Sequence, residues 1–250
     1  MRRRDFLKGL ALGAAAATLA PTRAFAFGDS SKFIPAIARH GGNWDRRGHG
    51  LRRICWEISN RTSAEVFPEA RPFGLAERAL FKYPFLYFGG EGSFPALTDD
   101  EVANLRRYLT YGGFMLADAN DGSNGDGFDA SFRREIARVL PSSPLTRLPP
   151  DHVVFKTFYL LDRNGGRLMT RPFLEAATVG KRVAVVYSQN DLAGAWSRDE
   201  HGDWEYECSP GGESQREVAI RTGVNLAFYA MCLDYKDDAV HLKYIMKRRR

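Results

Sequence analysis

The side chains that could take part in chemistry lie in four polar segments of the sequence, around positions 43–44, 91, 118–121 and 188–191. The candidate ligand contacts are Asn43, Trp44, Glu91, Asp118, Asn120, Ser188, Asn190 and Asp191. Asp118, Asp121 and Glu91 are also candidates for acid–base catalysis, in which a carboxyl group must come within about 3 Å of the proton that it moves. The same set could instead bind a polyol or an amide through paired donors and acceptors. A third explanation is that Asn, Asp and Ser favour turns for backbone reasons alone.

Other catalytic and metal sites have little support in the sequence. There is no Gly-x-Ser-x-Gly motif, and the glycine-rich pieces match neither a phosphate loop nor a dinucleotide fingerprint. The five histidines include no pair at zinc spacing. Segment 118–129 has oxygen ligands at several calcium-loop offsets, but Ser123 replaces the required glycine and Asp129 the required glutamate. We therefore expect neither a metal ion nor a cofactor.

The polar segments follow predicted strands. These strands cover residues 32–39, 84–88, 114–118 and 182–188, and the run 84–88 is apolar throughout. Continuous apolar runs are typical of parallel strands that are covered on both faces. Between the second and third predicted strands, Thr98 and Glu101 form a capping box, because each side chain can accept from the backbone amide of the other residue. Segment 84–118 is therefore predicted to be a strand–helix–strand unit with parallel strands.

The rest of the chain completes an α/β pattern. Apolar residues at helical spacing predict helices around 51–58, 132–140 and 217–233, and a short strand interrupted by proline is expected at 66–73. Segments 173–179 and 182–188 are rich in β-formers and could pair as a hairpin. This order predicts a mostly parallel, doubly wound α/β sheet with an added β-hairpin. Since ligands bind beyond the carboxyl ends of such strands, the polar segments should share one rim.

The N-terminal segment 1–26 has the features of a twin-arginine signal peptide. Arg3 and Arg4 precede an alanine-rich apolar run, which ends at the small-x-small sequence 24–26. The alternative is an uncleaved membrane anchor, but about twelve apolar residues are fewer than the roughly 20 that cross a bilayer as a helix. We expect the twin-arginine translocase and signal peptidase as partners, a periplasmic location, and no membrane span in the mature chain.

The positive charge is concentrated at the two ends of the chain. The formal net charge is +6, and segment 1–26 contributes five cations and one anion. The predicted tail 241–250 ends in four consecutive basic residues, so the predicted single domain 27–240 is close to neutral. A nucleic-acid partner is therefore not expected. The tail could dock on an envelope partner or on anionic lipid, or it could be a solvated charge run.

Several sequence blocks in a fixed order resemble a bacterial family, the domain of unknown function 4159. They are GGNW at 41–44, YPFLY at 83–87, LTYGGFMLAD at 109–118, YSQNDLAGAW at 187–196 and GVN at 223–225. The resemblance covers roughly residues 30–235. The family is similar to the class I glutamine amidotransferase fold, and many members carry export signals. The resemblance therefore implies a flavodoxin-like parallel sheet.

The resemblance does not extend to amidotransferase chemistry. Those enzymes place a cysteine nucleophile on the turn after the strand that corresponds here to 114–118. This chain has no Cys or Ser between that strand and Ser123, so an acyl-enzyme route has no nucleophile. The leading hypothesis is an exported, non-catalytic module that binds a small polar ligand or an envelope partner. The alternative is a hydrolase or sugar-active enzyme with Asp118 or Asp121 as general base and Glu91 as its partner.

Overall fold

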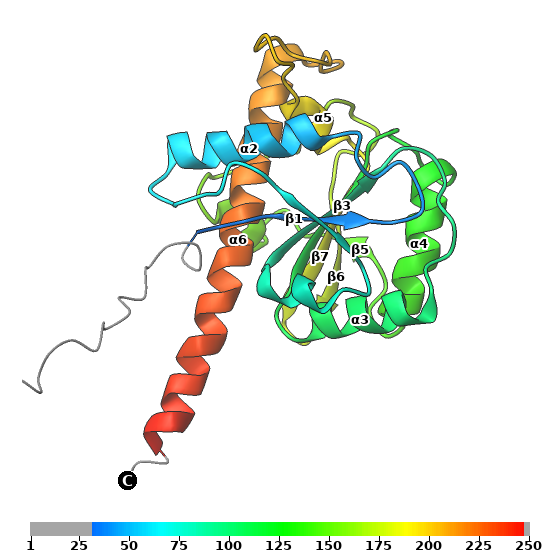
Figure 1. The fold of residues 1–250 in the computed structure, drawn as a ribbon. Helices are drawn as coiled ribbons and strands as arrows, with labels where there is room; N and C mark the ends of the chain where they lie inside the picture. Colours follow the sequence, from blue (N-terminus) through cyan, green and yellow to red (C-terminus); the bar gives the residue numbers. More distant parts are fainter. Residues whose placement is uncertain (1–31, 248–250) are drawn as a thin grey trace, which may run out of the picture. The chain divides into compact units, whose positions relative to one another are not determined.

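A seven-stranded sheet in the order β2-β1-β3-β4-β7-β6-β5 forms the centre of the fold (Figure 1). The computed structural model describes residues 32–247, and their side chains up to residue 232, so the signal peptide predicted at 1–26 lies outside it. The strands are β1 (Ala36–Arg39), β2 (Arg71–Gly74), β3 (Phe85–Gly90), β4 (Phe114–Ala119), β5 (Thr146–Arg147), β6 (Glu175–Val179) and β7 (Arg182–Ser188). The helices are α2 (Gly48–Arg61), α3 (Asp99–Thr110), α4 (Gly127–Val139), α5 (Leu192–Trp196) and α6 (Gly212–Lys247), with short 3₁₀ helices η1 (Arg78–Lys82) and η2 (Val153–Lys156).

Five neighbouring strands run parallel, and antiparallel pairing adds β6 and then β5 beyond β7. β2, β1, β3, β4 and β7 pair in parallel. This is the flavodoxin-like order, with β7 in the fifth place. β6 pairs antiparallel with β7, and β5 pairs antiparallel with β6. The predicted α/β class, the mostly parallel sheet and the added hairpin are therefore confirmed.

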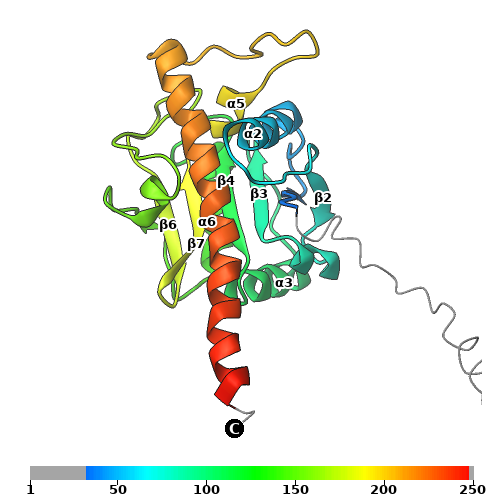
Figure 2. The ribbon, with the colours of Figure 1, turned by 90° about the vertical axis from the view of Figure 1, so that its left-hand side faces the viewer.

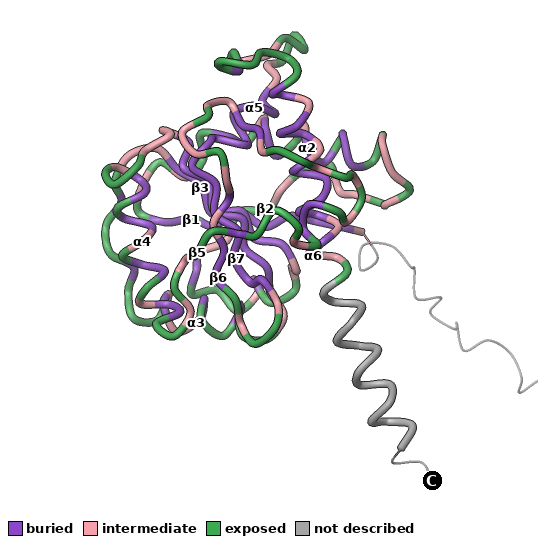
Figure 3. The backbone as a smooth tube through the Cα atoms, turned by 180° about the vertical axis from the view of Figure 1, so that it is seen from behind, coloured by how far each residue is buried: buried purple, intermediate pink, exposed green. Residues whose placement is uncertain are grey.

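Helices cover both faces of the sheet. Figure 2 shows α6 in front of the strands, with α2 and α5 on the same side. Tyr87 and Leu116 share a buried apolar cluster with residues of these three helices. Phe88 and Met115 belong to a second cluster with residues of α3 and α4. Every residue of β3 and β4 is buried, as the colour of the central strands in Figure 3 shows. Because successive side chains of a strand point to opposite faces, these strands are covered on both sides.

The predicted capping box opens α3. The Thr98 hydroxyl accepts from the Glu101 amide at 3.3 Å, and the Glu101 carboxylate accepts from the Thr98 amide at 2.8 Å. Because two orphan donors are satisfied at once, the helix has a defined first turn. α3 connects β3 to β4, which pair in parallel as predicted.

Two predicted strands are shorter than expected. The segments predicted at 32–39 and 66–73 form only β1 and β2, which begin at Ala36 and Arg71. Phe33 makes an isolated parallel bridge with Val66 ahead of them. Pro35 and the proline at position 68 lack the amide donor that a continuous ladder needs, which accounts for the interruption.

The last helix is longer than predicted. The sequence predicted a helix at 217–233, whereas α6 runs from Gly212 to Lys247 and so includes part of the predicted tail. Of the helices within residues 32–247, none combines the length and the apolar character that a membrane crossing requires.

Candidate functional site

The strand-end residues meet at the carboxyl ends of the parallel strands, but their side chains are buried inside the protein. Asp118 and Asn120 lie at the carboxyl end of β4, and Ser188, Asn190 and Asp191 lie at the carboxyl end of β7. All five side chains are buried, with an exposed fraction of 0%. The sequence predicted a shared rim for these residues. The structure places them together as a buried polar network, which we call the strand-end network.

Asp118 is held by four donors. Its carboxylate accepts from the backbone amides of Leu192 and Ala193 at 3.0 and 2.9 Å, which are the first residues of α5. It also accepts from the Tyr87 hydroxyl and from Asn120 Nδ2, each at 3.2 Å. Burial, and then the nearby carboxylate of Asp191, raise the pKa of Asp118 to about 7. Its contacts connect β4 to α5.

Asp191 forms a sharp turn between β7 and α5. Its backbone is left-handed, with φ 52° and ψ 66°, a conformation that is uncommon outside glycine. Its carboxylate caps α5 by accepting from the Gly194 amide at 2.9 Å. The same carboxylate accepts two bonds from Arg47, both at 3.0 Å, and one from Arg167 Nε. Hydrolases can carry a nucleophile on such a strand-to-helix turn, but here the side chain is buried between two guanidinium groups.

Arg47 connects the network to the segment after β1. Its Nη2 lies 2.9 Å from Glu91 Oε1 and 3.1 Å from the Asn120 carbonyl oxygen. Its Nη1 donates to the Tyr206 hydroxyl at 3.1 Å. The Arg47 side chain is 2% exposed, whereas that of Glu91 is 36% exposed. Glu91 is therefore the member of this set that faces solvent.

The other predicted residues hold loops in place. The Asn190 side chain accepts from the Arg171 backbone amide at 2.9 Å and donates to the Arg171 carbonyl oxygen at 2.7 Å. The Ser188 hydroxyl accepts from the Asn190 backbone amide at 3.1 Å. Asn43 makes an isolated bridge to Glu91, beside the point where the strand order changes between β1 and β3.

Two further candidates have structural contacts. Trp44 is partly buried against the apolar cluster that contains α2 and α6. Asp121 accepts from the backbone amides of Gly92, Ser123 and Phe128. Burial alone would raise the pKa of Asp121, but these hydrogen bonds outweigh it and lower the pKa.

One atom of the network lacks a partner. Asn120 donates through Nδ2 to the Tyr87 hydroxyl, Asp118 and Asp191. Its Oδ1 is buried and has no hydrogen-bond partner among the described residues. Buried acceptors are almost always paired, so this atom is an exception within the network.

Sequence reasoning missed Arg47 and Arg167, and it also missed a groove beside the network. The groove lies between α2 and the segment 198–202, and its volume is about 340 Å³. Its walls include Arg52, Arg53 and Trp56 from α2 and Arg198 from the facing segment. Arg47 immediately precedes α2, and Tyr206 lies just beyond the facing segment. The Arg47–Tyr206 contact therefore helps to fix the two walls relative to each other.

The candidate metal ligands of the described residues do not cluster. Within the described part of the chain, no group of three or more His, Cys, Asp or Glu side chains is arranged to hold a metal ion. Nearby histidines have other contacts: His49 pairs with Glu205, and His40 Nε2 lies 3.0 Å from the Gly89 carbonyl oxygen. Burial lowers the pKa of His40.

Comparison with protein families gives one match. The model of a family described as domain of unknown function (DUF4159) matches residues 34–231, which include the whole strand-end network and both walls of the groove. No curated protein matches the chain.

Proposed function

We propose that this chain, which belongs to the DUF4159 family, is a non-catalytic module that binds a small anionic ligand in the groove between α2 and segment 198–202. One observation carries the proposal. The strand-end carboxylates are paired inside the protein, while the arginines and the tryptophan of the adjacent groove line a cavity of ligand size.

The pairing of the carboxylates argues against acid–base catalysis. A general base must reach a proton of the substrate, directly or through one water molecule. Asp118 is completely buried and already accepts four hydrogen bonds. Asp191 is completely buried and paired with two arginines. These contacts support a structural role, in which the network positions the groove.

The groove has the chemistry to bind an anion attached to a ring. Arg52 is exposed and forms no hydrogen bond or ion pair within the described part of the chain. Trp56 is 50% exposed, and the Arg53 guanidinium lies 4.0 Å from the centre of its ring. A guanidinium can bind a carboxylate or phosphate in a bidentate manner, and an exposed indole offers a flat apolar surface.

The groove also contains two acidic residues, Asp199 and Glu200, and neither removes its capacity to bind an anion. Asp199 accepts from the backbone amides of His201 and Asp203, both at 2.9 Å, so its carboxylate is used within a turn. These amide bonds lower the pKa of Asp199, the bond from Asp203 most of all. Glu200 is exposed, so its carboxylate is solvated. Arg198 donates to the Gly202 carbonyl oxygen and packs 3.8 Å from the Trp204 ring centre, which holds the wall in place.

The export route and the finer fold family are part of the same proposal. We infer from segment 1–26 that the twin-arginine translocase and signal peptidase deliver the protein to the periplasm, where an envelope partner or a small solute is available. The parallel order β2-β1-β3-β4-β7 supports kinship with the class I glutamine amidotransferase-like folds. Fold kinship alone assigns no chemistry.

Calorimetric titration of the purified protein tests the binding function. Glucuronate and glucose 1-phosphate each join an anion to a ring, whereas glucose and inorganic phosphate each supply one half. We expect the two complete probes to bind at least tenfold more tightly than either half. Arg52→Ala and Trp56→Ala should each weaken binding at least tenfold, whereas Arg107→Ala, at an exposed position of α3, should not. Equal binding by all variants would contradict the proposal.

The hydrolase alternative predicts a different result. It requires turnover of a member of a hydrolase substrate panel, together with loss of that turnover in Asp118→Asn. Turnover that depends on Asp118 would contradict the non-catalytic proposal and support the hydrolase alternative.

A further inference from the structure

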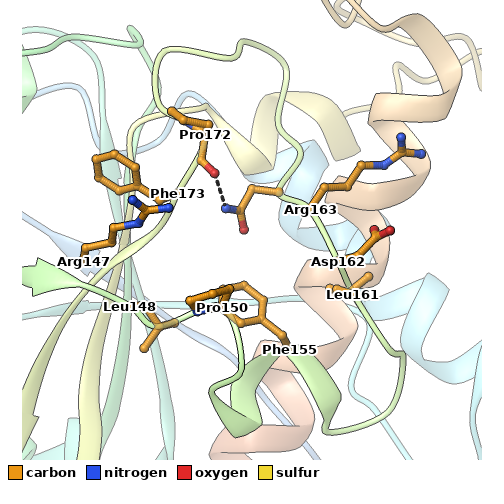
Figure 4. Close-up of a pocket in the computed structure, with 10 residues that line it drawn as sticks. Arg147, Leu148, Pro150, Phe155, Leu161, Asp162, Arg163, Pro172 and Phe173 are labelled. Carbon is orange, nitrogen blue, oxygen red and sulfur yellow. Dashed lines mark hydrogen bonds between the residues drawn. The ribbon is translucent and has the colours of Figure 1, made fainter.

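A second pocket lies at the edge of the sheet beside β5. Its volume is about 120 Å³, and Figure 4 shows the side chains that line it. Leu148, Phe155 and Leu161 supply apolar surface. The walls are fixed by backbone bonds from Leu148 to Leu174 at 2.8 Å and from Leu161 to Phe155 at 2.9 Å. Because an apolar cavity of about 150 Å³ can hold a benzene molecule, a pocket of this size can receive the side chain of a small ligand.

The pocket contains an acceptor that lacks a donor. Asn164 Nδ2 donates to the Pro172 carbonyl oxygen at 2.8 Å, the bond drawn as a dashed line in Figure 4. Because a carbonyl oxygen only accepts, this bond fixes which end of the Asn164 amide carries nitrogen. Asn164 Oδ1 is buried and has no hydrogen-bond partner among the described residues. A bound N–H group would satisfy it.

Cations lie on both sides of the pocket. The Arg147 guanidinium packs 4.9 Å from the ring centre of Phe173, and Arg163 lies on the opposite side next to Asp162 (Figure 4). Neither arginine forms a hydrogen bond or an ion pair within the described part of the chain. Arg147 is therefore available to a carboxylate.

We propose that this pocket binds a free amino acid with a small apolar side chain. Arg147 pairs with the carboxylate, Asn164 Oδ1 accepts from the ammonium group, and the apolar surface of Leu148, Phe155 and Leu161 receives the side chain. This pocket shares no lining residue with the groove on α2, so each of the two proposals can be tested without the other.

Titration of the purified full chain with L-leucine tests this assignment. The matched probes are 4-methylpentanoate, which lacks the ammonium group, and isoamylamine, which lacks the carboxylate. We expect saturable leucine binding at millimolar or lower concentration and at least tenfold weaker binding of either probe. Arg147→Gln and Asn164→Ala should each weaken leucine binding at least tenfold. Asn60→Ala, at an exposed asparagine of α2, should leave it unchanged.

Three outcomes would overturn the proposal. They are no leucine binding, equal binding of leucine and 4-methylpentanoate, and leucine binding that neither variant weakens. Should a variant fail to fold by circular dichroism, the wild-type protein still decides the matter by NMR. The side-chain amide signals of Asn164 must then shift on leucine addition, and their failure to shift would reject the site.

Discussion

Arg47 and Asp191 are 144 positions apart in the sequence and form a buried two-pronged ion pair, with both nitrogen–oxygen distances at 3.0 Å. The pair connects the residue before α2 to the residue before α5, whose helices pack together in the same apolar cluster. A fork of two N–H donors on one carboxylate fixes orientation as well as distance. The pair therefore sets how α2 lies against the strand-end network.

Loss of Arg47 should destabilise the protein. Arg47→Ala leaves the buried carboxylate of Asp191 with Arg167 as its single cation, and breaking a buried pair in this way costs roughly 3–5 kcal/mol. Urea denaturation should show this loss in the free energy of unfolding. Arg46→Ala is the matched control, because Arg46 is exposed, and it should change the free energy by less than about 0.5 kcal/mol. Equal effects of the two substitutions would contradict a buried role for Arg47.

The raised pKa of Asp118 predicts a stability that falls with pH. The pKa is about 7 in the folded protein and about 3.9 in an unfolded chain. Between these values the folded state holds more protons at Asp118 than the unfolded state does. The contribution of Asp118 to stability is therefore fully present below about pH 4 and is lost as pH rises through about 7. The free energy of unfolding measured from pH 5 to 8 should therefore decrease more steeply for the wild type than for Asp118→Asn. Parallel profiles would show that Asp118 is already ionised throughout this range.

Much of the fold could be predicted from local sequence, because the patterns that mark its strands and helices span only a few neighbouring residues. The run 84–88 and the Thr98–Glu101 capping box depend on neighbouring residues alone, and both segments form the expected elements. The candidate site could be predicted only in part. The residues that follow β4 and β7 could be placed at one edge of the sheet, because parallel strands share their carboxyl ends.

Two features of the site could not be predicted. Arg47 resembles a solvated loop cation in the sequence, and its burial depends on a carboxylate 144 positions away. Five-residue α5 is too short to show a periodic pattern, yet its first amides bind Asp118 and close the edge that the sequence predicted as a rim.

Because the backbone of Asp191 is left-handed, Asp191→Asn and Asp191→Ala should differ in their effect on stability. Asn tolerates this backbone region and can still cap α5, whereas Ala does neither well. Both changes remove the charge that pairs with Arg47, so both should destabilise. Asp191→Ala should cost about 1–2 kcal/mol more than Asp191→Asn, because of the left-handed backbone. Thermal and urea denaturation of the two variants measure this difference. A smaller cost for Ala than for Asn would show that the turn relaxes in the variants.

Two glycines of α2 provide a matched test of how closely α2 packs on α5. A Cβ atom added at Gly50 would lie 2.1 Å from the Ala193 carbonyl oxygen, whereas one added at Gly48 would meet nothing within 4 Å. Gly50→Ala must therefore push the two helices apart, at a cost of about 1–3 kcal/mol. Gly48→Ala should leave stability unchanged or raise it by up to about 1 kcal/mol, because alanine favours the helix. Since α2 is one wall of the groove, Gly50→Ala should also weaken binding of glucuronate, while Gly48→Ala should not. Normal stability and normal binding in Gly50→Ala would contradict the close contact between α2 and α5.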